Sequence, residues 1–171
     1  MAFLVEDGTI VAGATSYTTV AYYKAYWLDR GVTVAETDPV IEAALVIVTQ
    51  YVDLMNRWKG CIVDDAQPLD WPRYDVWDDE LRYIESNEVP ARLQNAICEY
   101  ASAQIVSTIS PEPSLKGEIK VEMSKLGTLE EEIEYTENSS RTIRSIPLAD
   151  NWLKGFTVGG LLGNFSRTVR C

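Results

Sequence analysis

The clearest pattern of apolar positions lies between residues 38 and 58. Apolar side chains recur there every three to four residues, the spacing that places them on one face of an α-helix: Ile41, Ala44, Leu45, Val48, Tyr51, Val52 and Met55. We expect Asp38 to cap this helix and Pro39 to occupy its first position, where a missing N–H costs no hydrogen bond. Gly60 stands just beyond the expected end near Trp58. This segment is predicted to be the central core helix.

An earlier segment shows the same spacing. It follows Thr19, whose hydroxyl suits a helix N-cap, and it is expected to run to about Arg30, before Gly31. Its apolar stripe contains Val20, Tyr23 and Trp27. Near the other end of the chain, a short helix is predicted from about Pro147 to Lys154, with Leu148, Trp152 and Leu153 as its apolar residues.

A third long helix is predicted to start near Asn87 or Glu88, with Pro90 in its first turn, and to end before Pro111. Its apolar face contains Val89, Leu93, Ala96, Ile97, Tyr100, Ala101 and Ile105. Between the second and third helices, residues 61–88 carry several turn signals and no helical period. We expect this long loop to pack through its own aromatic side chains, Trp71, Tyr74, Trp77 and Tyr83.

The period changes to two after the third helix. Ile119, Val121 and Met123 alternate with polar residues, and a return strand is expected from Leu129 to Tyr135 after a turn at 126–128. The chain should therefore be mainly α, with a small three-to-four-helix core, the long loop, a β-hairpin and extended terminal arms. We expect a helical domain over 1–155, containing the loop (61–88) and the hairpin (117–135), followed by a C-terminal arm over 156–171.

Charge is unevenly distributed along the chain, whose formal net charge is −11. Residues 138–171 contain five basic residues and one acid, 5 − 1 = +4, whereas residues 1–137 contain ten basic residues and 25 acids, 10 − 25 = −15. An acidic body repels nucleic acid, whose binding depends on neutralising phosphates with Lys and Arg. An asymmetry of this kind is typical of proteins whose charges set partner choice and orientation during assembly.

The sequence gives little support for catalysis or metal binding. Histidine, the commonest general base, is absent. The cysteines Cys61, Cys98 and Cys171 have no metal-binding spacing, and we expect three free thiols in a cytosolic product. The acidic clusters lack the glycine turn and closing ligands of a calcium loop and are interpreted as solvated surface: Asp64–Asp65, Asp75 with Asp78–Glu80, and Glu130–Glu132. We therefore expect no catalytic residue, no cofactor and no metal.

Two short motifs on either side of a polar gap are interpreted as a structural element that fixes the loop. Arg57-Trp58-Lys59-Gly60 closes the core helix, and Gln67 to Arg73 follows after a short polar gap. Trp71-Pro72 is a restricted dipeptide that can stack against a helix end, while Arg57 and Arg73 can pair with Asp64–Asp65 or cap helix carbonyls. We interpret the set as a staple that holds the loop: Arg57, Trp58, Gly60, Pro68, Trp71, Pro72 and Arg73.

The end of the chain combines basic and apolar residues. Its apolar content is higher than a solvating tail needs, and its glycines favour an arm that gains structure on a partner. The predicted partner-binding residues are Trp152, Phe156, Leu161, Leu162, Phe165, Arg167 and Arg170.

These motifs are similar to those of head–tail connector proteins of tailed bacteriophages, also called adaptor or head-completion proteins. The resemblance rests on the opening Val5-Glu6-Asp7-Gly8-Thr9, Arg57-Trp58-x-Gly60, Gln67-Pro68-Leu69-x-Trp71-Pro72-Arg73 and the Val89-Pro90 helix with Ala96, Glu99 and Ala101. It extends to about Leu153, and the tail beyond Phe156 has no counterpart. Relatives of this sequence are also called DnaT-like single-stranded-DNA-binding proteins.

The resemblance implies a structural virion protein at the head–tail interface, present in the host cytoplasm during assembly. Such an adaptor docks under the dodecameric portal protein as a homo-oligomeric ring, expected to be dodecameric, and receives the next neck or tail-completion protein. DNA would only pass through the channel that the ring lines, and neither an enzymatic activity nor a membrane contact is implied. The alternative is a single-stranded-DNA-binding accessory protein of replication.

Overall fold

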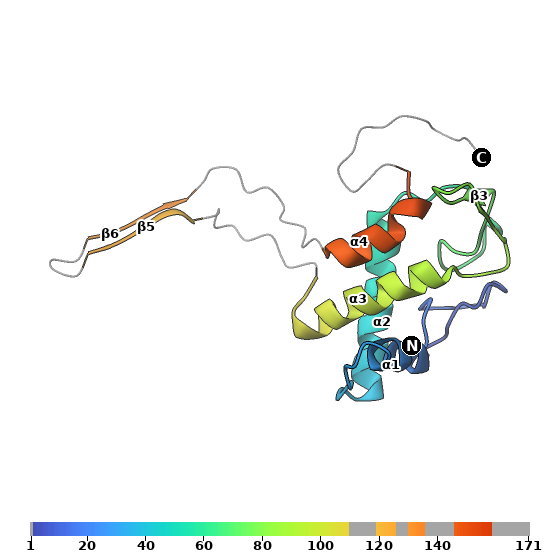
Figure 1. Ribbon diagram of the computed structural model, residues 1–171, viewed down its shortest axis with the longest axis horizontal. Coiled ribbons are helices and arrows are strands. Elements are labelled where there is room, and N and C mark those ends of the chain that lie inside the picture. Colours follow the sequence, from blue (N-terminus) through green and yellow to red (C-terminus); the bar gives the residue numbers. More distant parts are fainter. Residues whose placement is uncertain (1, 110–118, 126–129, 136–145, 159–171) are drawn as a thin grey trace. The chain divides into compact units, whose positions relative to one another are not determined.

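The computed structural model describes residues 2–109, 119–125, 130–135 and 146–158, with 119–125 and 130–135 described by their backbone. The fold is mainly helical, as predicted (Figure 1). The elements are α1 (Val20–Leu28), α2 (Asp38–Met55), β1 (Cys61–Ile62), β2 (Arg73–Tyr74), β3 (Val76–Trp77), β4 (Tyr83–Ile84), α3 (Ala91–Val106), β5 (Ile119–Lys125), β6 (Glu130–Tyr135), α4 (Pro147–Leu153) and the 3-10 helix η1 (Lys154–Phe156). None of the helices in these residues is both long and apolar enough to cross a membrane.

The chain forms two compact units. One comprises residues 1–107 together with 145–171, and the other comprises residues 108–144. In the second unit, β5 and β6 pair antiparallel from Ile119 opposite Tyr135 to Lys125 opposite Glu130, with an irregularity between Ile119 and Val121. The predicted hairpin is therefore confirmed, although its expected turn at 126–128 lies outside the described residues.

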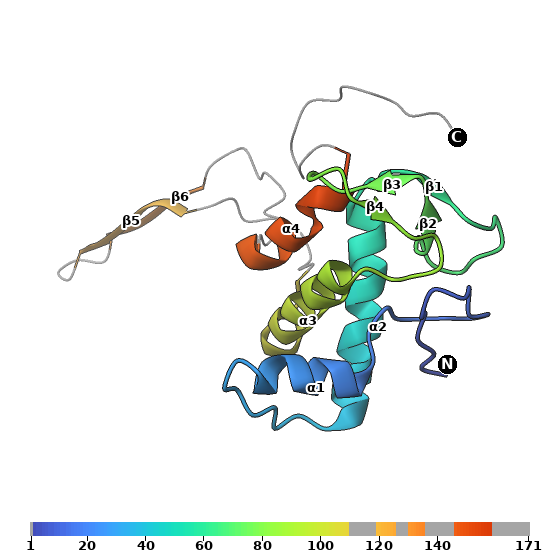
Figure 2. The same ribbon diagram turned by 45° about the vertical axis from the view of Figure 1, so that its right-hand side comes forward.

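The core of the first unit is built on α2 and α3. In α2, Ile41, Leu45, Val48 and Val52 are fully buried, and the predicted face of α3 is buried at Leu93, Ala96, Ile97, Tyr100 and Ala101. Burying one such large aliphatic side chain contributes roughly 1.5–3 kcal/mol. α3 contacts both α2 and α4, and α1 lies near the N-terminal end of α2, where it also contacts α3 (Figure 2).

The helix ends differ from the predicted ones by a few residues. Thr37, and not Asp38, is the N-cap residue of α2, and Asp38 instead pairs with Lys24 of α1. α2 ends at Met55, short of Trp58, because Asn56 is extended and its side-chain nitrogen donates to the Val52 carbonyl at 2.8 Å. The backbone after Asn56 is thereby released from the helix and carries Trp58 toward the loop.

The other two long helices show similar adjustments. The Thr19 hydroxyl accepts from the Tyr22 amide at 3.0 Å, which confirms the predicted N-cap of α1. Tyr26 of α1 is buried together with Tyr23, whereas the stripe predicted for this helix omitted it. α3 starts at Ala91 with Pro90 in the cap position, because the carbonyl of Pro90 accepts the first helical amides, those of Leu93 and Gln94.

The N-terminal segment closes on itself instead of extending throughout as an arm. The carboxylate of Glu6 is 1% exposed and accepts hydrogen bonds from the amides of Gly8, Ile10 and Val11 at 2.8–2.9 Å. Val5 forms a parallel bridge with Ser16, which leads into the fully buried Tyr17. A buried carboxylate is tolerated here because three N–H groups replace its hydration.

Two glycines with similar backbone angles provide a test of this packing. Gly60 (φ +64°) and Gly31 (φ +75°) both lie in the left-handed region, but a Cβ on Gly60 would lie 2.3 Å from the Tyr74 carbonyl oxygen, whereas Gly31 has open space around it. Gly31→Ala should therefore lower the free energy of unfolding by about 1–2 kcal/mol, the cost of the left-handed conformation. Gly60→Ala should cost roughly 1–3 kcal/mol more because the backbone must shift. If urea denaturation showed the same loss of unfolding free energy for both variants, the backbone of β2 at Tyr74 would have to move aside for the new Cβ at no cost.

Candidate functional site

The side chain of Trp71 anchors the middle of the 61–88 loop to the helical core. Its ring is 0% exposed and lies edge-on to two others, with centroid distances of 5.7 Å to both Trp58 and Phe156. Trp58 follows α2 and Phe156 ends η1, so the three rings join segments distant in the sequence. We call Trp58, Trp71 and Phe156 the aromatic anchor. The peptide bond between Trp71 and Pro72 is cis.

Two polar side chains fix the loop backbone beside the aromatic anchor. The guanidinium of Arg73 donates to the carbonyls of Lys59 (2.9 Å), Gly60 (2.7 Å) and Asp70 (3.2 Å). Gln67 accepts from the amides of Val63 and Asp64 at 3.0 and 3.1 Å, and it donates to the carbonyls of Leu69 and Pro72. Neither role predicted for Arg73 is the one observed, because its three polar contacts are with main-chain carbonyls of the loop and of the residues after α2, and not with helix carbonyls or with Asp64–Asp65.

A buried polar chain connects the aromatic anchor to the N-terminal segment. The Trp71 amide donates to the Tyr17 hydroxyl at 3.1 Å, and this hydroxyl donates to both carboxylate oxygens of Asp53 in α2 at 2.8 Å. Burial raises the pKa of Asp53 to about 7, with a further increase from the nearby charge of Asp70, although the hydrogen bond from Tyr17 lowers it. Burial and the Asp53 charge also raise the pKa of Tyr17 well above its usual value.

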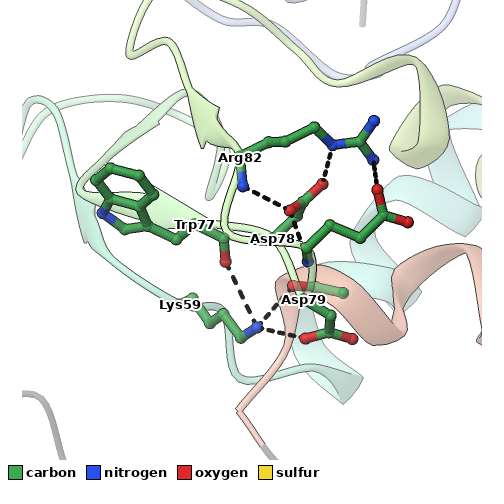
Figure 3. Close-up of polar contacts among 7 residues, drawn as sticks. Lys59, Trp77, Asp78, Asp79 and Arg82 are labelled. Carbon is green, nitrogen blue, oxygen red and sulfur yellow. Dashed lines mark hydrogen bonds and ion pairs between the residues drawn. The ribbon is translucent and has the colours of Figure 1, made fainter.

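The far part of the loop is held by Lys59 and Asp78 (Figure 3). The ammonium of Lys59 contacts the Asp79 carboxylate and the Gly155 carbonyl at 2.8 Å each, and the Trp77 carbonyl at 3.5 Å. The carboxylate of Asp78 accepts from the amides of Glu80 and Arg82 and from the Arg82 guanidinium, each at 2.9 Å. These hydrogen bonds, first of all that of the Arg82 amide, lower the pKa of Asp78.

Most of the predicted staple residues lie close to this end of α2. Trp58, Gly60, Trp71, Pro72 and Arg73 lie together, and the carbonyl of Arg57 accepts from the Val158 amide at 2.7 Å. Pro68 is exposed at the edge of the loop. The sequence did not lead us to predict the hydrogen bonds that Lys59, Tyr17 and Asp53 make to hold the loop. The signals available were the position of Lys59 inside the Arg57–Gly60 motif and an acid, Asp53, that directly follows Val52 of the apolar face of α2.

The predicted partner-binding set divides into three groups. Phe156 belongs to the aromatic anchor and is 1% exposed, so its assignment as a residue free to bind a partner is wrong. Trp152 of α4 is half-buried. Leu161, Leu162, Phe165, Arg167 and Arg170 lie outside the described residues.

Metal-binding potential and cysteine chemistry complete the description of the site. Within the described residues, no cluster of three His, Cys, Asp or Glu side chains could hold a metal ion. Cys98 is buried as a free thiol, and burial raises its pKa. Cys61 is disulfide-bonded, which corrects the expectation of three free thiols.

Removal of the buried Trp71 ring should destabilise the protein strongly. Trp71→Ala is expected to lower the free energy of unfolding by about 3–5 kcal/mol, as large aromatic truncations in cores do. Trp77→Ala is the matched control, because Trp77 belongs to the same loop but is 47% exposed, and it should cost far less. Thermal and urea unfolding measure both changes. A Trp71→Ala variant as stable as the control would contradict the role of Trp71 as an anchor.

Asp53 should make stability depend on pH. Because its folded pKa is raised from 3.8 to about 7, the folded state keeps its proton while the unfolded state ionises between these values. Stability should therefore fall as pH rises from about 4 to 7, by roughly 4 kcal/mol from this group, and stay level above 7. Asp53→Asn should remove this component, which urea denaturation at several pH values measures. Parallel pH curves for the wild type and Asp53→Asn would contradict it.

Comparison with known proteins gives one match. Searches of curated proteins and of solved structures find no significant similarity. A protein-family model matches residues 1–171, which includes the tail beyond Phe156 that the sequence resemblance did not cover. That family is described as "Putative DnaT-like ssDNA binding protein", and the chain belongs to it.

Proposed function

We propose that the protein is a structural adaptor of a tailed-bacteriophage virion, a ring-forming subunit between the portal protein and the next neck or tail-completion protein. The observation that carries this proposal is an acidic surface from which large apolar side chains project. In the 61–88 loop alone, six are exposed: Ile62, Val63, Tyr74, Trp77, Leu81 and Tyr83. Exposed apolar side chains gathered in one segment are typical of protein–protein contact surfaces.

The use of buried polar groups supports a structural role. Asp53 and Tyr17 bind each other and the loop backbone, and Asp78 closes the turn that precedes β4. These groups are fully engaged in holding the loop, which leaves them little chemistry to offer a substrate. The resemblance of the Trp71-Pro72-Arg73 element to connector proteins adds the identity of the assembly, a portal-bound ring whose channel DNA passes through.

Single-stranded-DNA binding is the second candidate function, and the family description favours it. Such a site would need basic side chains available to phosphates. In the first unit, Lys24, Lys59 and Arg82 form ion pairs with Asp38, Asp79 and Asp78. Arg73 donates to three carbonyls. These four side chains are engaged within the fold, so a DNA site would have to use other basic residues, which include those of 138–171.

A pair of binding measurements separates the two functions. The purified protein should bind a labelled single-stranded oligonucleotide more weakly than micromolar at about 0.15 M salt, because its body is acidic. It should co-sediment as a ring with the portal protein of the same phage. Arg167→Glu combined with Arg170→Glu is the control for charge in the tail.

Micromolar or tighter DNA binding would favour the second function, provided that it weakens steeply as salt rises and is lost in the double variant. Failure to co-sediment with the portal protein would count against the adaptor role independently of the DNA result.

A further inference from the structure

The helix α2 carries a second, mostly apolar stripe on its solvent side. Its members recur at alternating intervals of three and four residues, the heptad spacing of surfaces through which helices pair: Val40, Ala43, Ile47, Gln50 and Leu54. All five are exposed, with exposed fractions of 47%, 46% and 84% for Val40, Ile47 and Leu54. α1 and α3 contact other sides of α2 (Figure 2). We call these five residues the outer stripe.

The outer stripe differs from the solvent side of an ordinary surface helix. Such a helix has charged residues on its solvent side, whereas a helix that is apolar all round is covered on all sides. Of the 18 residues of α2, only Asp38, Glu42 and Asp53 are charged, and none of them belongs to the outer stripe. Asp38 pairs with Lys24, and Asp53 binds Tyr17. The solvent side of α2 therefore has the composition of a contact surface for another apolar surface.

We propose that the outer stripe pairs with the outer stripe of a second copy of this chain, with the two α2 helices antiparallel. In the register that matches the sizes of the side chains, Leu54, the most exposed member, lies opposite the partner's Ala43, the smallest member. Ile47 then lies opposite the partner's Gln50. The two Gln50 side chains come within one helical turn of each other at the two-fold axis, where each amide can donate to the other and accept from it.

Charge favours both the second copy and the antiparallel orientation. Each copy has a net charge of −11, so two copies approach most readily through an uncharged surface, which the outer stripe provides. Glu36 and Asp38 lie at the N-terminal end of α2, and Arg57 follows its C-terminal end. Parallel pairing would place these acids beside the same acids. Antiparallel pairing brings them toward the partner's Arg57 and sets the two helix dipoles in opposite directions.

The size of the contact sets its strength. The outer stripe spans about 21 Å of helix axis from Val40 to Leu54. One helix face of this length buries less than the roughly 800 Å² per partner of a standard interface. The core already holds α2 as a helix, so pairing has to order side chains only. We therefore expect a weak, reversible pair in the free protein. A two-fold contact closes after two copies, so the pair does not depend on the proposed ring.

Sedimentation velocity of the full chain from about 1 to 500 μM measures the pairing, over the range expected for a contact below standard size. We expect a monomer–dimer equilibrium that tightens as salt rises, because screening weakens the repulsion between two acidic copies. Ile47→Ser and Leu54→Ser should each raise the dissociation constant roughly tenfold or more, because each removes two aliphatic side chains from the pair. Leu28→Ser, an exposed leucine of α1 outside the outer stripe, should leave it unchanged.

Further variants test the orientation of the two helices. Ala43→Leu should weaken an antiparallel pair, because the larger side chain collides with the partner's Leu54. It would strengthen a parallel pair, in which small residues face each other. Under mild oxidation, a mixture of the variants Ala43→Cys and Leu54→Cys should form a disulfide-linked mixed dimer, whereas Val40→Cys alone should not link to itself. The unsubstituted chain under the same conditions is the control for links through the native cysteines.

Two kinds of result would overturn the proposal. A chain that stays monomeric at every concentration and salt, or that pairs equally well with Ile47→Ser and Leu54→Ser, would show that the outer stripe does not pair with a second copy. Strengthening by Ala43→Leu, or efficient linking through Val40→Cys alone, would refute the antiparallel register. Either failure would leave the adaptor role standing, because portal co-sedimentation measures that role separately.

Discussion

The burial of Trp71 is the contact on which the rest of this structure depends. The 61–88 loop contains only two-residue strands, and short ribbons of this kind are not stable by themselves in water. Trp71 brings the loop against Trp58 and Phe156, and its amide reaches the Tyr17–Asp53 pair. Trp71 thus contacts the N-terminal segment, the residues after α2 and η1, and adds to the direct hydrogen bonds of Tyr17 with Asp53 and of Lys59 with Phe156. The turn that carries Trp77 and Leu81 inherits its position from this contact.

Local features of this fold could be predicted from the sequence, whereas long-range ones could not. The apolar period of α2, the Thr19 cap and the alternation in β5 are properties of neighbouring residues, and the structure has them where they were expected. The partner of Trp71 is Phe156, which the sequence suggested to be part of a free arm because glycines follow it. Arg73 binds carbonyls, an outcome that residue types alone left open, since acids and carbonyls were equally plausible acceptors.

Basic and acidic side chains have different roles in this part of the structure. Lys59 and Arg73 bind groups of the fold, and Arg82 closes its own turn, while carboxylates such as Asp79, Glu80 and Glu85 remain at the surface. The described 61–88 segment therefore presents mostly negative charge to its surroundings. Contacts made through such a surface form faster at low ionic strength and select partners of opposite sign.

The position of the 108–144 unit has a consequence for how this chain can evolve. The unit is inserted between α3 and α4, which contact each other in the other unit. The two points where the unit joins the rest of the chain are therefore already held close together by the contact between α3 and α4. Loop-closure entropy grows slowly with length, so doubling such an insertion costs only about 0.6 kcal/mol. The hairpin can therefore lengthen, shorten or change its tip across related sequences while the core sequence stays under its own packing constraints.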